Sequence, residues 1–166
     1  MENAGMWRQL ALFVLAIGFV SGCVRINDDL GQVFRYKHPK IGARKKVMRS
    51  IAGSLKNIKI ATEAGGGVGP MRKIKWAAQD IAKNARKIRG TFRHRTMGGV
   101  TRSTSKVWDN WSGFTQTAGN LAASAEILAM AADGGDTSGV KNGIKTIGAN
   151  CGKCHKSFRV KKKMKK

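Results

Sequence analysis

Cys151-Gly152-Lys153-Cys154-His155 is the stretch from which the fold can be worked out. A Cys-x-x-Cys-His run is the attachment signature of a c-type haem. On a helix, residues three and four positions apart share a face. Both thiols can therefore bond the vinyl groups of one porphyrin, while the imidazole of His155 turns towards the iron. The motif predicts one covalent haem c per chain, with His155 as the axial iron ligand.

A Cys-x-x-Cys pair has two other uses, as a redox dithiol and as half of a zinc site. A structural zinc site needs two further ligands, and the sequence has no second Cys pair and no His-x-x-x-His. A thioredoxin-like dithiol lies in a βαβ setting, whereas the flanks of this motif predict helix. Haem attachment is therefore the interpretation that the sequence favours.

The N-terminal segment resembles a bacterial export signal. Arg8 gives the positive charge expected near the N-terminus of such a signal. Residues Leu10 to Val20 form an almost wholly apolar run that is too short to span a bilayer. Val20-Ser21-Gly22-Cys23 follows and resembles a lipobox, so we expect Cys23 to be lipidated. The alternative is ordinary cleavage near Ser21 or Gly22, which would leave Cys23 as a free or dimer-linking thiol.

Three segments follow from this pattern. We expect an export signal in residues 1–23, a tether in residues 24–40, where no periodicity is sustained, and a single haem-binding domain in residues 41–166. With such a signal, we expect the domain on the periplasmic side of a bacterial envelope. The lipid on Cys23 would anchor it to the membrane; in the alternative, the protein is soluble in the periplasm.

A net charge of +23 is the most unusual feature of the composition. Nucleic acid is not the expected partner, because the aromatic residues are not interleaved with the basic ones in a stacking pattern. On an exported protein, a cationic surface favours anionic lipid head groups or the acidic face of a redox partner. The basic run of residues 161–166 is expected to be a solvated end of the last helix.

Four stretches carry apolar side chains three or four residues apart, which indicates four amphipathic helices. The stripes are Met48, Ile51, Leu55 and Ile58; Ile74, Ala77, Ile81, Ala85 and Ile88; Trp108, Trp111, Phe114, Ala118, Leu121, Ala125, Leu128 and Ala132; and Val140, Ile144, Ile147, Cys151, Cys154 and Phe158. No run alternates as a strand would.

Glycine and capping residues predict where these helices begin and end. Residues 65–67 end the first helix, Gly90 ends the second, and a basic loop over residues 90–104 precedes the third. Residues 103–105 are candidate caps for the third helix, and Asp136 for the fourth. We therefore predict an all-α fold, an antiparallel four-helix bundle with the haem on the C-terminal helix, covered by the first helix and flanked by the third.

Several features together resemble the cytochrome c′ family over about residues 41–163. They are the late attachment motif followed by Phe158, Arg159 and lysines, the Ala132-Asp133-Gly134-Gly135-Asp136 turn, Trp108 with Phe114 six residues later, and Arg44 four residues before Met48. The resemblance implies a haem pocket of Arg44, Met48, Trp108, Phe114, Phe158 and Arg159.

The resemblance also implies roles for the residues on each side of the iron. Arg159 would lie near the proximal face, one turn after His155, and Arg44 would meet a haem propionate. Met48 would pack over the iron without bonding it, which leaves a five-coordinate centre that binds nitric oxide and carbon monoxide. In the related low-spin class II cytochromes a methionine is the sixth ligand, so it stays open whether Met48 binds the iron. It also stays open whether Arg44 and Arg159 are simply solvent-exposed cations.

The sequence therefore leaves two hypotheses for the function. The first is a haem protein of cytochrome c′ type that binds diatomic gases or passes electrons, and many of that family are homodimers. The second is a dedicated electron carrier with Met48 bound to iron. An enzyme is the weakest hypothesis, because no acid–base pair or nucleophile constellation lies outside the haem motif. His38 and His94 are expected to be exposed side chains, not ligands.

Overall fold

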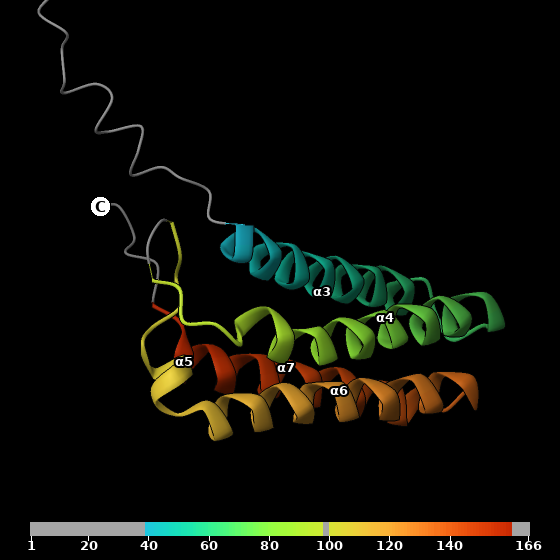
Figure 1. The fold of residues 1–166 in the computed structure, drawn as a ribbon. Helices are drawn as coiled ribbons and strands as arrows, with labels where there is room; N and C mark the ends of the chain where they lie inside the picture. Colours follow the sequence, from blue (N-terminus) through green and yellow to red (C-terminus); the bar gives the residue numbers. More distant parts are fainter. Residues whose placement is uncertain (1–38, 98–99, 161–166) are drawn as a thin grey trace, which may run out of the picture. The chain divides into compact units, whose positions relative to one another are not determined.

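The computed structural model describes residues 39–97 and 100–160, and this part of the chain is helical (Figure 1). Its helices are α3 (Pro39–Glu63), α4 (Val68–Phe92), α5 (Lys106–Asp109), α6 (Trp111–Asp133) and α7 (Thr137–Phe158). The predictions for the export signal, Cys23, the tether as far as residue 38, His38 and residues 161–166 lie outside the described residues. Among the helices that are described, none has the length and hydropathy to cross a membrane.

Four long helices run side by side and form the predicted bundle (Figure 1). α3 packs on α4, α4 on α6, and α6 on α7. The core between them is aliphatic, with Ile58, Ile74, Ile81, Leu128 and Ile147 fully buried. Over the described residues α3 and α7 form no comparable interface, so the bundle has one side on which two helices do not close on each other.

The third predicted helix is interrupted, which corrects the prediction of one continuous element. Asn110 has a non-helical backbone and ends α5, and its side-chain oxygen accepts a 3.0 Å hydrogen bond from the backbone N–H of Gly113. An asparagine in this position supplies an acceptor for a free N–H in the first turn of the following helix. Asn110 therefore caps α6, and residues 103–105 precede only the short α5.

The connection between α4 and α5 is shorter than predicted and is fastened to the last helix. α4 continues through Gly90 to Phe92, since one glycine costs only about 1 kcal/mol in a well-packed helix. Later in the connection, Ser103 forms an antiparallel bridge with Arg159. The N–H of Thr104 donates to the carbonyl of Phe158 at 3.0 Å. The loop is thereby held against the C-terminal end of α7.

The turn before α7 forms as the sequence predicts. Gly135 has a φ of 69°, a left-handed conformation that glycine adopts without steric cost. The carboxylate of Asp136 then accepts a 2.9 Å hydrogen bond from the N–H of Gly139 and caps the helix. Farther along, a Cβ on Gly143 would lie 3.1 Å from Leu128, so this glycine allows α7 to approach α6 closely. These contacts set the position of the helix that carries the cysteine motif.

Candidate functional site

A cavity of about 580 Å³ lies on the open side of the bundle, between α3 and α7. Its volume falls within the ~300–1,000 Å³ typical of small-molecule and cofactor sites. Apolar side chains dominate the lining, among them Ile51, Leu55, Ile88, Phe114, Leu121 and Phe158. A flat apolar group could therefore fill the space that the two helices leave.

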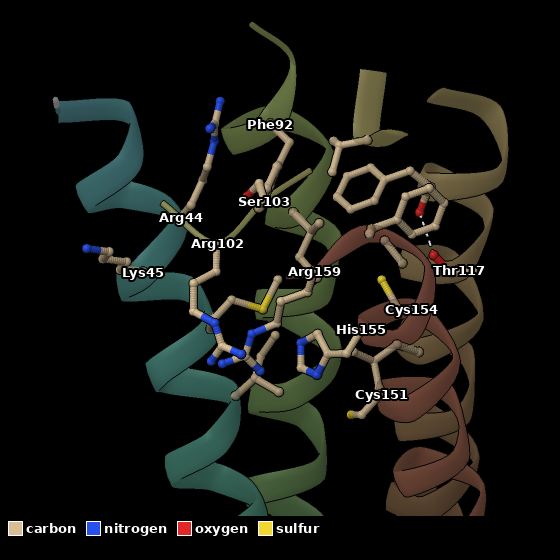
Figure 2. A pocket seen from close by; sticks show the side chains of 18 of the residues that line it. Arg44, Lys45, Phe92, Arg102, Ser103, Thr117, Cys151, Cys154, His155 and Arg159 are labelled. Atoms are coloured by element: carbon tan, nitrogen blue, oxygen red, sulfur yellow. Dashed lines mark hydrogen bonds between the residues drawn. The ribbon is translucent and has the colours of Figure 1, made fainter. Parts of the chain in front are cut away.

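Cys151, Cys154 and His155 line this cavity from α7 (Figure 2). Asn150, immediately before the motif, donates a 2.7 Å hydrogen bond from its side chain to the hydroxyl of Ser124 on α6. This link holds the first turn of the motif against the neighbouring helix. Both thiols are free and half-buried, and they lie on the wall of the cavity as the i, i+3 spacing predicts.

The protonation of the three groups fits the attachment of a porphyrin. Burial raises the pKa of both the Cys151 and the Cys154 thiol. A redox dithiol or a metal site instead needs an accessible thiolate, and the described residues contain no cluster of three metal-binding side chains. Burial, with the charges of Arg159 and Arg102, lowers the pKa of His155. The imidazole is therefore neutral at neutral pH and has a lone pair to offer to a metal ion.

Met48 lines the cavity from α3, the helix that faces α7 across it. It is half-buried, whereas Val47 and Ile51 on the same helix are buried in the core. Leu55, two turns on, also lines the cavity. The apolar stripe predicted for this helix thus belongs partly to the cavity wall, and the thioether of Met48 lies on the wall opposite the motif.

Arg44 is buried, with only 3 % of its surface exposed, so it is not the surface cation that the sequence left open. Its guanidinium donates to the carbonyls of Thr91, His94 and Thr96 at 3.1, 2.7 and 3.1 Å. It also lies 4.7 Å from the ring of Phe92. Thr91 lies in the last turn of α4, and His94 and Thr96 follow it. Arg44 therefore fastens α3 to the end of that helix, and a haem carboxylate would have to share the guanidinium with these carbonyls.

We expect Arg44→Met to destabilise the protein by about 3 kcal/mol, because it removes three charge-assisted hydrogen bonds to part-buried carbonyls. The free energy of unfolding from urea titrations, followed by circular dichroism, measures this loss. Lys46→Met, on the exposed side of the same helix and outside the cavity lining, is the matched control and should change stability by less than about 0.5 kcal/mol. Equal effects of the two substitutions would contradict the structural role of Arg44.

The three aromatic residues expected in the pocket have different places. Phe114 and Phe158 line the cavity and contact each other edge to face, with ring centroids 5.3 Å apart. Trp108 is not part of the lining, contrary to the prediction. Its indole N–H donates to the carbonyl of Phe92 at 2.7 Å, and its ring stacks on the guanidinium of Arg44 at 5.1 Å. Trp108 therefore belongs to the structure that surrounds Arg44.

The remaining predicted residues are Arg159 and His94. Arg159 lines the cavity beside His155 (Figure 2). His94 is exposed, as expected, and only its backbone carbonyl takes part in the contacts of Arg44. Arg102 also lines the cavity and was missed by the sequence, because a basic residue in a glycine-containing loop gives no signal of where the loop lies.

The motif, the apolar walls and the volume all suit a covalently bound haem. Cys151 and Cys154 would bond the porphyrin and His155 would hold its iron, while the apolar side chains would cover the ring faces. Lys45 and Arg49 line the cavity with exposed side chains. They are therefore the more available cationic partners for the carboxylates of the group.

The chain matches the family model described as cytochrome c′ over residues 40–159. Among curated proteins, a cytochrome c-556 from Agrobacterium tumefaciens (strain B2A) is 30 % identical over 74 % of this chain and 98 % of its own length. A cytochrome c-556 from Agrobacterium fabrum is 30 % identical over 76 % of this chain and 85 % of its own length.

Solved structures of the same architecture are also similar. The cytochrome c′ of Thermochromatium tepidum superposes with a TM-score of 0.65 at 25 % identity and covers 74 % of this chain and 95 % of its own. A nitric oxide complex of a cytochrome c prime variant from Alcaligenes xylosoxidans gives a TM-score of 0.65 at 20 % identity, over 75 % of this chain and 95 % of its own. The second likeness concerns the fold alone.

Proposed function

Because this chain belongs to the cytochrome c′ family, we propose that it transfers electrons and binds nitric oxide or carbon monoxide at a haem c iron. Membership of the family implies a covalent haem c, and Cys151 and Cys154 in α7 fit the attachment motif. The haem supplies the redox-active and gas-binding iron. The protein supplies a binding site and not an enzyme's acid–base machinery.

The observation that carries the proposal is the cavity between α3 and α7. The α7 wall offers two thiols and an imidazole. The α3 wall offers apolar side chains and the thioether of Met48, with the cationic side chains of Lys45 and Arg49 beside them. In this arrangement His155 would hold the iron from α7. The opposite side is bounded by α3, whose position Arg44 holds.

We propose that Met48 covers the iron without bonding it, so that a small gas can enter on that side. Met48 packs against the buried core cluster that contains Val47 and Ile51. A methionine held by such packing reaches the iron only if α3 lies close to the porphyrin plane. Its bulk would then restrict the size of the ligand that enters.

A second candidate is a dedicated electron carrier in which the thioether of Met48 is the sixth ligand. One observation favours it: the curated relatives that match most of the chain are named cytochrome c-556, not cytochrome c′. Methionine with histidine is a common ligand pair in electron-transfer cytochromes. The two candidates share the cofactor, its attachment and His155, and differ in one bond.

Visible and electron paramagnetic resonance spectra of the purified ferric protein test the proposal, because both report the spin state of the iron. We expect a high-spin ferric spectrum, and a ferrous form whose absorption shifts when carbon monoxide is added. A low-spin spectrum in both oxidation states, unchanged by carbon monoxide, would favour the second candidate. The absence of a reversible one-electron couple would contradict both.

The location is proposed from the sequence before the described domain. We propose that the protein lies on the periplasmic side of the envelope and is attached through a lipid on Cys23. Mass spectrometry of the mature N-terminus should then find an acylated cysteine, and Cys23→Ala should release the protein into the osmotic-shock fluid. An unmodified N-terminus in the soluble fraction of the unchanged protein would contradict the anchor.

The net charge of +23 supports an acidic partner, and we propose that the redox partner docks by an acidic face. We also propose a homodimer, because many members of the family that the sequence resembles are dimers. A relative of known structure, a cytochrome c′ at 22 % identity, is named for a ligand-controlled dissociation of its dimer. Sedimentation with and without carbon monoxide measures the dimerisation of this chain.

A further inference from the structure

Arg102 is tied to the end of α7 by both its main chain and its side chain. Its carbonyl accepts a 2.8 Å hydrogen bond from the N–H of Val160. Its guanidinium donates two hydrogen bonds to the carbonyl of Val160, from Nε at 3.1 Å and from Nη2 at 2.7 Å. A loop arginine is thereby held in a defined position at the end of the helix that carries the attachment motif.

The charge of Arg102 lies beside the imidazole of His155. Arg102, Arg159 and His155 line the same cavity, and the close view shows the three side chains gathered at one side of it (Figure 2). Arg159 follows His155 by four residues, and Arg102 is paired with Val160, the next residue, so both cations lie at the same end of α7 as the ring. Neither arginine takes part in the ion pairs found among the described residues, which involve other side chains.

We propose that Arg102 is a positioning residue that raises the reduction potential of the iron through its fixed positive charge. The inference rests on the proposed electron transfer with His155 as ligand. When a donor protein or an electrode passes one electron to ferric iron, the site gains one negative charge and no bond forms or breaks. A nearby fixed cation stabilises the reduced form relative to the oxidised form, by an amount that falls with ionic strength.

The bridge between Ser103 and Arg159 gives this charge its fixed position. Arg102 is exposed, so solvent and salt screen part of its charge, but its hydrogen bonds to Val160 hold the guanidinium in one place. Here the loop is paired with residues 158–160, so Arg102 lies against the helix end that carries the iron ligand. The loop between α4 and α5 thus acts on the cofactor from outside the four long helices.

Spectroelectrochemical titration of the haem-loaded protein tests the inference. Arg102→Gln should lower the potential, so that the equilibrium constant for reduction by a given donor falls roughly threefold to tenfold. The larger value corresponds to about 59 mV for one electron. The shift should shrink as salt is added. Arg102→Lys keeps the charge and should leave the potential near that of the unchanged protein.

Arg89→Gln is the control, because it removes the same charge from an exposed position on α4 that does not line the cavity. A shift in Arg102→Gln no larger than the control shift, or an equal shift in Arg102→Lys, would overturn the inference and leave the proposed function standing. If the unchanged protein shows no reversible couple, the proposed function fails and the inference fails with it.

Discussion

A variant with both Cys151→Ala and Cys154→Ala is expected to lose all covalently bound haem. Thioether bonds to the vinyl groups need both thiols, and the structure places both on the cavity wall beside His155. Any residual haem would be held only by apolar contacts and His155. It should therefore leave the protein in acid acetone, and the mass of the polypeptide should equal that of the apoprotein.

Lys153→Ala is the matched control, since Lys153 lies within the same pentapeptide but is exposed and lines no part of the cavity. This variant should keep its haem through the same extraction. The single change Cys154→Ala should leave haem that is extractable or lost. Haem that survives acid acetone in the double cysteine variant would overturn the attachment and, with it, the role given to this helix.

The second large effect concerns the side of the iron that faces α3. If Met48 only covers the iron, Met48→Ala should leave the ferric spectrum high-spin and increase the affinity for carbon monoxide by about tenfold, or about 1.4 kcal/mol. The reason is that the steric cover is removed while no bond to iron is lost. Optical titration of the ferrous protein with carbon monoxide measures the affinity, and flash photolysis measures the rate.

Met48→Leu separates this result from the rival one, because leucine keeps the bulk of the side chain and removes the sulfur. With Met48 as a cover, Met48→Leu should behave as the unchanged protein does. With Met48 as a ligand, the unchanged protein should be low-spin and inert to carbon monoxide, and both substitutions should convert it to high-spin. That second pattern would move the function from gas binding to electron transfer alone.

The bundle could be predicted from the sequence because its long helices have regular apolar stripes and recognisable ends. The stripe of Ile74, Ile81 and Ile88 is buried throughout, and Asp136 caps α7 as expected. The attachment motif could be placed on the cavity for the same reason, since its spacing follows the stripe of α7. Periodicity and capping are local, and local signals are sufficient for these features.

The apolar stripe of α3 shows a case in which hydrophobic periodicity does not predict which side chains belong to the protein core. Met48 and Leu55 have the spacing of core residues, yet they line the cavity, while Val47 and Ser54 are buried. A cofactor with two apolar faces requires the same kind of side chain as a protein core does. Hydrophobic spacing therefore cannot separate residues that contact the protein from residues that contact the haem.

Other features depend on contacts between distant residues, which a single sequence does not contain. Arg44 has the composition of a surface residue, but carbonyls 47 to 52 positions away bury it. The role of Arg102 depends on a main-chain pairing with Val160, 58 positions away. The break at Asn110 had a local signal, a capping asparagine, which the continuous stripe from Trp108 to Phe114 concealed.

The missing interface between α3 and α7 has a consequence for the order of assembly. α3 packs on α4 without the cofactor, and its buried residues belong to the same core cluster as those of α4, α6 and α7. We therefore expect the four long helices to pack against one another before the porphyrin is attached. An attachment enzyme would then reach both thiols from the side on which α3 and α7 do not close on each other.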